Sequence, residues 1–468
     1  MKNSIEEQMF SIEQSYSVES IEYKGVKLWP FLRTMIHYSK LKTQYVQSSQ
    51  VFCDKFFRAL KIMNEHLSGV LLTNFSLFKK NKSSILFTTN YQMYKENGEV
   101  LNRLMNNIER YVGEFTPVLQ INMSKEKGMY KNRYINERLI NDKISLRAKK
   151  ITLQDGAIKG EKELLDIFKE LDISFDYKST IPLIIAGIDY YTEWFEKILP
   201  RCLIIECYYD IKMCASYAAK KLGIPTIEIQ HGTITERSFE YNSKKEIVDN
   251  PYPEWLFTYG QAEKDSIGNH NVYKKDKIIP IGSYWVEKKK NMDVLEINSC
   301  RDKYNNDIIV AVIGQLTVDD KLTEIVKRLS KRDKKITYVY VPRVIEKKYK
   351  KMVCENIYIE EELDVYTVMR SSDVVLMVYS TCGLESIALG TPVVIADING
   401  LGTCYYGDIA RKVKNIRIAV EEADIINAIR FSKNAKRGEV TTESNYYFHE
   451  NHDESVKKAI KIVLGDKK

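Results

Sequence analysis

Short apolar runs that alternate with polar, helical stretches mark out the strands of this chain. The run at 374–378 is apolar and largely β-branched, which favours a buried parallel strand. Hydroxyl residues and a glycine follow it and begin a short helix. Gly390 and Pro392 end that helix before the next apolar run at 393–395. The pattern therefore predicts a strand–helix–strand unit over 372–399 with very little loop.

The same alternation continues along most of the chain from residue 84 onward. Further strands are predicted at 85–88, 118–121, 182–187, 202–206, 224–230, 255–260, 278–283, 308–313, 337–343 and 357–359. Helices are predicted over much of 1–80 and at 101–111, 210–222, 314–329, 365–370, 423–434 and 453–465. Repeated β–α units are typical of doubly wound parallel sheets, so the chain is predicted to be of the α/β class.

The length of the chain and one polar stretch divide it into domains. A chain of 468 residues is too long for one hydrophobic core and suits two α/β domains. A polar, lysine-rich stretch follows the last predicted strand of the first half and is interpreted as a connection. We therefore predict an N-terminal domain at 1–283 with a helical first segment, a linker at 284–300, a C-terminal domain at 301–445 and a terminal helical segment at 446–468.

The turn after the strand at 374–378 carries side chains that suit a nucleotide. The hydroxyls of Ser380 and Thr381, the N–H groups of the turn and the adjoining Gly383 can hold a phosphate at the start of a helix. Glu385 lies one turn further on and can accept hydrogen bonds from two ribose hydroxyls. Phosphate at the turn and ribose at the glutamate together indicate a nucleotide. The alternative is an ordinary capped helix with an acidic first turn.

Two further features of the C-terminal half are candidate nucleotide contacts. Gly314, Gln315 and Thr317 follow the strand at 308–313 and form a second turn at which a phosphate can bind. Arg343 comes at the carboxyl end of the next predicted strand, where a guanidinium group can pair with a phosphate. Open α/β sheets bind ligands outside the carboxyl ends of their strands, so these residues are predicted beside the nucleotide.

The segment that begins at Asp373 also resembles a known family. It reads D-V-V-L-M-V-Y-S-T-C-G-L-E-S-I-A-L-G-T-P-V-V-I and is similar to the donor-nucleotide segment of GT-B glycosyltransferases. The resemblance implies that Glu385 binds the donor ribose and that Ser380 and Thr381 meet the donor phosphates. It also implies two Rossmann-like domains that face a central cleft, with a last helix that returns to the first domain.

The stretch at 203–232 carries a second resemblance. A strand, an acidic residue, a helix with A-A-K-K-L-G-I-P-T and a strand that ends in Q-H-G are similar to bacterial surface-polysaccharide GT-B enzymes, including sialyltransferase-like, Kdo-transferase-like and teichoic-acid-polymerase-like proteins. His231 in this turn can contact a donor phosphate or act as an acid or base. The alternative is a histidine that only caps its strand. Gln230 and Gly232 complete the turn, and Arg237 lies in the loop that follows.

A glycosyltransferase that inverts its sugar needs a group that deprotonates the acceptor hydroxyl. The candidates after predicted strand ends of the first domain are Asp189, Glu206, Asp210 and His231, with Asp189 and His231 as the first choices. The resemblance implies no bound metal, because helix ends and basic side chains stabilise the leaving phosphate. The sequence also lacks a D-x-D pair in a suitable loop, so neither a metal nor a cofactor is predicted.

The net charge and the cysteines indicate which kinds of partner the protein can bind and in which cellular compartment it is expected. The formal net charge of +8 favours an anionic partner such as a nucleotide, a phospholipid surface or an acidic glycan, and no nucleic-acid-binding motif is present. Eight scattered cysteines without a C-x-x-C pair argue for reduced thiols. Without a secretory signal or a membrane-length apolar run, a cytoplasmic protein is predicted. The basic, amphipathic stretch at 52–82 can lie on the inner membrane face or pack onto its own domain.

These observations together predict a GT-B glycosyltransferase. It would move a sugar from a CMP- or UDP-activated donor onto an oligosaccharide or lipid-linked glycan acceptor of a growing surface polysaccharide or lipopolysaccharide. The alternatives are a nucleotide-sugar 2-epimerase, a CDP-glycerol-type phosphotransferase and an inactive glycan-binding subunit.

Overall fold

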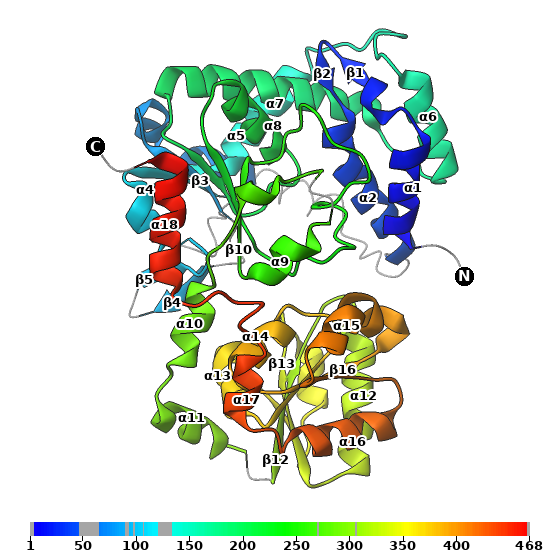
Figure 1. The fold of residues 1–468 in the computed structure, drawn as a ribbon, viewed down its shortest axis with the longest axis vertical. Coiled ribbons are helices and arrows are strands. Elements are labelled where there is room, and N and C mark those ends of the chain that lie inside the picture. The colour runs from blue at the N-terminus through cyan, green and yellow to red at the C-terminus, as the bar shows by residue number, and fades with distance from the viewer. Residues whose placement is uncertain are drawn as a thin grey trace. The chain divides into compact units, whose positions relative to one another are not determined.

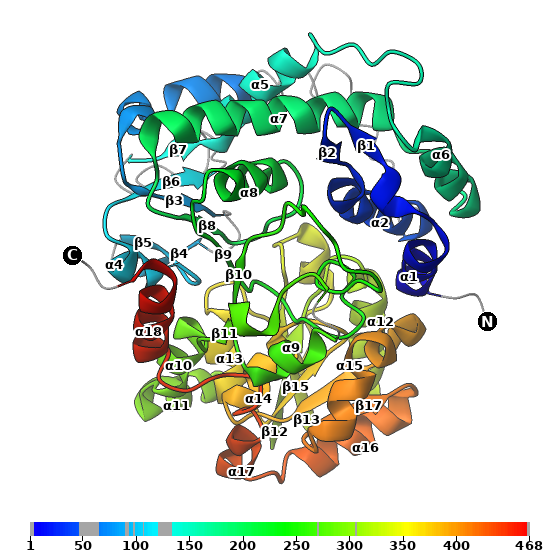
Figure 2. The same cartoon turned by 45° about the horizontal axis from the view of Figure 1, so that its top comes forward.

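The computed structural model describes residues 4–45, 65–88, 93–96, 99–105, 107–119, 133–268, 271–304 and 307–465. The chain divides into two compact units. The first unit comprises Met1–Ile281 and Asp453–Lys468, and the second comprises Gly282–His452. Within each unit, helices cover a parallel sheet on both faces (Figures 1 and 2).

The described part of the first unit has a seven-stranded parallel sheet in the order β11-β10-β9-β8-β3-β6-β7. Its strands are β3 (Ser84–Phe87), β6 (Phe115–Leu119), β7 (Ile135–Asn136), β8 (Leu203–Ile205), β9 (Thr226–Ile229), β10 (Trp255–Thr258) and β11 (Ile278–Pro280). Two small antiparallel pairs are β1 (Glu22–Tyr23) with β2 (Val26–Lys27), and β4 (Met93–Glu96) with β5 (Glu99–Asn102). The central strands are buried on both faces, which is why they read as continuous apolar runs.

The second unit has a six-stranded parallel sheet among its described residues, in the order β14-β13-β12-β15-β16-β17. Its strands are β12 (Ile308–Ile313), β13 (Ile336–Val341), β14 (Ile357–Ile359), β15 (Val374–Met377), β16 (Val393–Ala396) and β17 (Ile416–Ala419). Counted along the chain, this order is 3-2-1-4-5-6, that of a Rossmann-type sheet. The strand order reverses between β12 and β15 in the second unit, and between β3 and β8 in the first.

Helices of the first unit surround its sheet (Figure 2). They are α1 (Ile5–Ser15), α2 (Trp29–Tyr45), α4 (Ile108–Val112), α5 (Glu137–Ala148), α6 (Glu161–Glu170), α7 (Tyr177–Ile198), α8 (Lys212–Lys221), α9 (Gln261–Ser266) and α18 (His452–Leu464). The Tyr111 hydroxyl donates a hydrogen bond to the Asp453 carboxylate of α18, 2.6 Å away. The last helix therefore packs on the first unit, although nearly the whole second unit precedes it in the chain.

Helices of the second unit form two layers (Figures 1 and 2). They are α10 (Tyr284–Lys290), α11 (Val294–Arg301), α12 (Asp319–Arg332), α13 (Val365–Ser371), α14 (Cys382–Ala388), α15 (Leu401–Lys412), α16 (Glu422–Ser432) and α17 (Arg437–Thr442). Helix α14 packs with α13 and α17, α12 packs with α16, and α15 packs on β16 and β17. Residues 284–300, which the sequence analysis assigns to a linker, fold mainly into α10 and α11 and group with the second unit.

Two predicted elements of the first half are wrong. The strand predicted at 182–187 is part of the 22-residue helix α7. Its buried positions recur every three or four residues, as in Ile181, Ile184 and Ile185, which is the spacing of a helix face. Pro182 sits inside this helix, where proline is disfavoured, and the apolar run around it therefore reads as a strand. The helix predicted at 101–111 is the end of β5 followed by the short helix α4.

The amphipathic stretch at 52–82 is only partly covered, because 52–64 lie outside the described residues. Residues 65–71 are helical, and Phe75–Lys79 form a 3-10 turn. Among the residues that the structure describes, no helix is both long enough and apolar enough to span a bilayer.

Candidate functional site

The two turns predicted to hold a nucleotide meet at the reversal point of the second unit's sheet. The Gly314–Thr317 turn follows β12, and the Tyr379–Thr381 turn follows β15. The side-chain oxygen of Gln315 accepts hydrogen bonds from the backbone N–H groups of Val378 at 3.0 Å and Tyr379 at 2.9 Å. Gln315 therefore ties the two strand ends together, at the place where open α/β sheets bind their ligands.

Gly314 and Thr317 of the first turn, and Arg343 after β13, are the other predicted nucleotide contacts near this strand end. A Cβ atom at Gly314 would lie 3.0 Å from the Val341 carbonyl oxygen, so this glycine lets β12 end close against β13. Thr317 is exposed, and its hydroxyl forms a hydrogen bond with the Tyr379 hydroxyl. Arg343 is exposed in the loop after β13, the strand next to β12.

The second turn is stabilised from within and from α15. The Cys382 N–H donates to the Ser380 hydroxyl at 3.3 Å, and the Tyr406 hydroxyl donates to the Ser380 carbonyl. Gly383 is required here, because a Cβ atom would lie 2.6 Å from the Tyr406 hydroxyl oxygen. Thr381 is the N-cap of α14, and its side chain makes no capping hydrogen bond. Helix α14 has only seven residues. An anion at its start would therefore be bound mainly by the hydroxyls and N–H groups of the turn.

Glu385 is a buried carboxylate in the first turn of α14. Only 6% of the residue is exposed. The Tyr366 hydroxyl of the neighbouring helix α13 donates a hydrogen bond of 2.8 Å to Glu385 Oε1. A buried carboxylate is costly unless it is hydrogen-bonded, and Tyr366 supplies one such bond. The sequence analysis missed Tyr366, because a tyrosine in a predicted helix carries no signal of this contact.

The first unit has a polar cluster at the matching position of its own sheet. Glu206 follows β8 and is 1% exposed, and the Thr88 hydroxyl after β3 donates to its Oε2 at 2.6 Å. The Asn102 amide of β5 donates in turn to the Thr88 hydroxyl. The predicted position of Glu206 at a strand end is therefore correct, and the carboxylate lies where the strand order reverses.

The Q-H-G turn follows β9 and is held by its glutamine. Gln230 is fully buried, and its amide nitrogen donates to the Gly232 carbonyl at 2.7 Å and to Glu263 at 3.1 Å. Its amide oxygen accepts from the Tyr259 N–H at 2.6 Å. A Cβ atom at Gly232 would meet no atom within 4 Å, so packing within the protein does not require this glycine.

His231 is half-buried in this turn. The Tyr209 ring meets the imidazole edge to face at 5.6 Å, and the backbone of Glu206 is a hydrogen-bond partner of the imidazole. Burial lowers the pKa of His231 to about 4, and the charge of Lys212 acts in the same direction, while Glu240 opposes it. The imidazole is therefore neutral at pH 7 and can accept a hydrogen bond but cannot offer a positive charge to a phosphate.

Asp210, before α8, and Arg237, after the turn, are both exposed. Asp210 has a left-handed backbone (φ 65°), and its carboxylate accepts a hydrogen bond from the Lys212 N–H at the start of α8. The Lys212 ammonium lies 3.3 Å from Asp210 and 3.7 Å from Glu137. Asp210 thus pairs with Lys212 through both the backbone N–H and the ammonium group of that residue. Arg237 is exposed in the loop after the turn.

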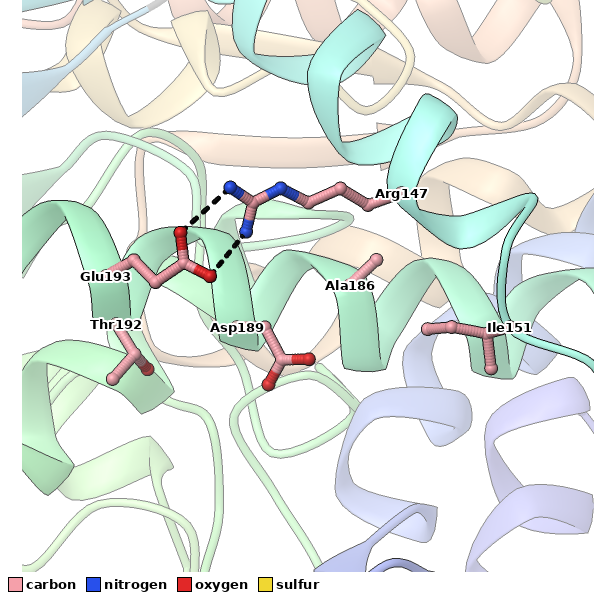
Figure 3. Close-up of a pocket in the computed structure, with 6 residues that line it drawn as sticks. All are labelled: Arg147, Ile151, Ala186, Asp189, Thr192 and Glu193. Carbon is pink, nitrogen blue, oxygen red and sulfur yellow. Dashed lines mark hydrogen bonds and ion pairs between the residues drawn. The ribbon is translucent and has the colours of Figure 1, made fainter.

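Asp189 was predicted as a base because it was expected to follow a strand, and this position is wrong, since Asp189 lies within helix α7. It is exposed in the middle of α7 and lines a hollow of about 320 Å³ with Arg147, Ile151, Thr192 and Glu193 (Figure 3). Arg147 forms two hydrogen bonds of 2.9 Å with Glu193. The hollow is lined from α5, α7 and the chain after α5, and no strand end contributes to it.

The N-terminal helices contribute charges that the sequence analysis missed. Arg33 of α2 and Glu13 of α1 form a fully buried ion pair at 2.7 Å, and Arg33 also donates to the Asn242 carbonyl at 2.6 Å. His37 of α2 lies 3.3 Å from Glu6 and 3.2 Å from Glu240. Asn242 and Glu240 belong to the loop after the Q-H-G turn, so both contacts fix that loop from a segment about 200 residues earlier in the chain.

A buried carboxyl group also lies three residues before His231. Glu228 of β9 accepts hydrogen bonds from the hydroxyls of Tyr241 at 2.8 Å and Tyr273 at 2.5 Å. Burial raises the pKa of Glu228 to about 8, although both hydrogen bonds oppose the shift. In the described ranges, no group of three His, Cys, Asp or Glu side chains is arranged to hold a metal ion.

Two Rossmann-type parallel-sheet units in one chain define the GT-B fold, and comparisons with solved structures agree. No protein family and no curated protein matches the sequence. The glycotransferase of kitacinnamycin has a similar structure, and the match covers 82% of this chain and 98% of that protein, with 10% sequence identity and a TM-score of 0.51. The structure of S. aureus MnaA with UDP is also similar, and the match covers 82% of this chain and 97% of that protein, with 11% sequence identity and a TM-score of 0.50. The UDP-GlcNAc 2-epimerase of Neisseria meningitidis with UDP-GlcNAc covers 82% of this chain and 98% of its own, at 13% identity and a TM-score of 0.47.

Proposed function

We propose that this chain is a metal-independent glycosyltransferase. It takes a sugar from a CMP- or UDP-linked donor and transfers it to an oligosaccharide or lipid-linked glycan of a bacterial surface polysaccharide or lipopolysaccharide. The observation that carries the proposal is the second unit's reversal point, where a hydroxyl-rich turn and the buried carboxylate of Glu385 adjoin. The glycotransferase and the UDP complex among the structures of similar fold support a nucleotide-sugar substrate.

The donor nucleotide is proposed to bind at this turn. The Ser380 and Thr381 hydroxyls and the N–H groups of the turn bind the phosphates, and the free oxygen of Glu385 accepts hydrogen bonds from the ribose. Tyr366 keeps the carboxylate oriented through Oε1. Gln315 has a positioning role, because both of its bonds go to the backbone of the strand that carries the turn.

The acceptor is proposed to bind at the carboxyl edge of the first unit. In the reaction, an acceptor oxygen forms a bond to the sugar's anomeric carbon, the bond from that carbon to the donor phosphate breaks, and the nucleotide leaves with the bonding electrons. The acceptor proton passes to a base if the reaction inverts. His231 and Glu206 are the candidates, because both follow strands of the first unit's sheet.

A nucleotide-sugar 2-epimerase is the second candidate function. Enzymes of that activity with bound UDP-GlcNAc are among the similar structures, and an epimerase needs the same nucleotide contacts. An epimerase would convert the donor alone, whereas a transferase needs an acceptor.

Product analysis tests the proposal. Thermal shifts with CMP, UDP, GDP and CDP first identify the nucleotide, because a bound ligand stabilises the fold by mass action. The corresponding sugar nucleotides are then incubated with and without a glycan acceptor, and the products are identified by mass spectrometry and NMR. Transfer to the acceptor supports a transferase. Inversion at C2 of the donor alone supports the epimerase, and binding without any turnover supports an inactive binding subunit.

A further inference from the structure

Two tyrosines form a stacked pair beside the second unit's hydroxyl turn. Tyr379 directly follows β15, and Tyr405 lies on α15. Their ring centroids are 5.0 Å apart, and the ring planes differ by 23°. Tyr405 is 48% exposed.

The pair is rigidly attached to the sheet edge. The Tyr379 backbone N–H donates to Gln315 at 2.9 Å, and the Tyr379 hydroxyl bonds the Thr317 hydroxyl. Both partners come from the chain after β12, the neighbouring strand. The next residue of α15, Tyr406, donates to the Ser380 carbonyl and so fixes α15 against the turn. Tyr405 is thereby presented from an anchored backbone, and an exposed ring of this kind loses little conformational freedom when a ligand binds.

The pair and Glu385 contact different neighbours around the turn. Glu385 is in the first turn of α14 and is hydrogen-bonded to α13, whereas Tyr405 is on α15, the helix that donates a hydrogen bond to the Ser380 carbonyl. Along the chain, Ser380 lies between Tyr379 and Glu385. If the ribose binds Glu385 and the phosphates bind the turn, the part of the donor beyond the phosphates extends toward the tyrosines. That part is the sugar.

We propose that the Tyr379–Tyr405 pair is a stacking platform for the sugar ring of the donor. This inference rests on the nucleotide site of the proposed function. The apolar C–H face of a sugar ring packs on the exposed Tyr405 ring, while the adjacent Thr317 and Tyr379 hydroxyls are available to the sugar hydroxyls. The platform would distinguish sugar nucleotides from the free nucleotide, which lacks the ring that stacks.

Binding measurements on three variants test the platform. The probes are UDP and UDP-GlcNAc, with CMP and CMP-N-acetylneuraminate as a second pair, and Kd is measured by calorimetry. Tyr405→Ala should bind the sugar nucleotide roughly three- to tenfold more weakly, the range expected for one lost ring contact, and the free nucleotide as the wild type does. Tyr405→Phe keeps the ring and should bind both ligands normally. Tyr446→Ala removes another exposed tyrosine of the same unit, one that meets Tyr447 edge to face, and serves as the matched control.

The outcomes separate the platform from the nucleotide site. Equal weakening of UDP and UDP-GlcNAc in Tyr405→Ala would mean that the ring stacks on the nucleoside, and the sugar assignment would be overturned. Unchanged Kd values for all ligands in Tyr405→Ala would overturn the platform alone. If the wild-type protein bound none of these nucleotides, the proposed function and the platform would fall together.

Discussion

Replacement of Glu385 tests the nucleotide site most directly. The residue is 6% exposed, and Tyr366 occupies Oε1 at 2.8 Å. Two effects follow from Glu385→Ala. A ribose loses a charge-assisted acceptor, which costs about 1.5–3 kcal/mol. The Tyr366 hydroxyl also loses its acceptor inside the protein, which costs about 1–3 kcal/mol of folding stability.

The two effects can be separated by the choice of variant. A loss of about 1.5–3 kcal/mol corresponds to a roughly 10- to 150-fold increase in the nucleotide Kd. Glu385→Gln retains an amide oxygen that can accept from Tyr366, so its stability should stay closer to the wild type while the charge toward the ribose is lost. Tyr366→Phe makes the opposite change: it removes the internal hydrogen bond and keeps the carboxylate. The expected order of Kd is therefore Glu385→Ala above Glu385→Gln, with Tyr366→Phe nearest the wild type.

A second tyrosine-bonded glutamate provides a matched control. Glu360 after β14 is 9% exposed and accepts a 2.7 Å hydrogen bond from the Tyr304 hydroxyl in the same unit. It lies three strands from β15, about 14 Å at the usual strand spacing. Glu360→Gln should cost stability without changing the nucleotide Kd. Calorimetric titration and urea unfolding measure both quantities. A folded Glu385→Ala protein with the wild-type Kd would refute the assignment of Glu385 to the ribose.

Three further predictions concern the first unit. His231→Ala should lower turnover strongly while the nucleotide Kd and the melting temperature stay close to wild type; normal turnover would make the histidine a strand cap. Glu13→Ala should lower the free energy of unfolding, measured in urea, by about 3–5 kcal/mol, because it leaves the buried Arg33 guanidinium without its carboxylate; an unchanged free energy would contradict this. Burial opposes protonation of His37, but Glu240 and Glu6 outweigh it and raise the pKa of His37 to about 9. The stability that protonated His37 adds should therefore be complete below about pH 6.5 and should disappear as the pH rises through about 9. The unfolding free energies of the wild type and of His37→Gln should accordingly converge above about pH 9. A difference between them that stays the same at every pH would contradict this.

The second unit was easier to predict from the sequence than the first, because its signals lie in neighbouring residues of the chain. Its strands are buried on both faces, so each is a continuous apolar run, as at β12 and β15. Gly390 and Pro392 mark the end of α14 in the sequence itself. The turn at Ser380 and the glutamate one turn later are likewise neighbours in sequence, so a reader of the sequence can place both on one helix.

Contacts between distant segments could not be predicted in the same way. Nothing around Gln315 indicates that its side chain binds the backbone 63 residues later, because an isolated glutamine has no pattern. The same holds for His37, whose partner Glu240 comes from the loop after the Q-H-G turn. For α7 the sequence signal was misleading: Pro182 is disfavoured inside a helix, so the apolar run around it was predicted as a strand, whereas the helix forms because its face from Ile181 to Ile198 is buried.

The polar groups at the two sheet reversals favour different ligands. In the second unit, the reversal offers hydroxyls and N–H groups at Ser380 and Thr381, and the nearby carboxylate of Glu385 is set back in α14. In the first unit, the carboxylate of Glu206 occupies the reversal itself and already accepts a hydrogen bond from Thr88. A phosphate placed there would meet the carboxyl oxygens of Glu206, whereas a sugar hydroxyl could donate a hydrogen bond to them. The polar groups of the two edges are therefore consistent with the proposed nucleotide in the second unit and the proposed hydroxyl-bearing acceptor in the first.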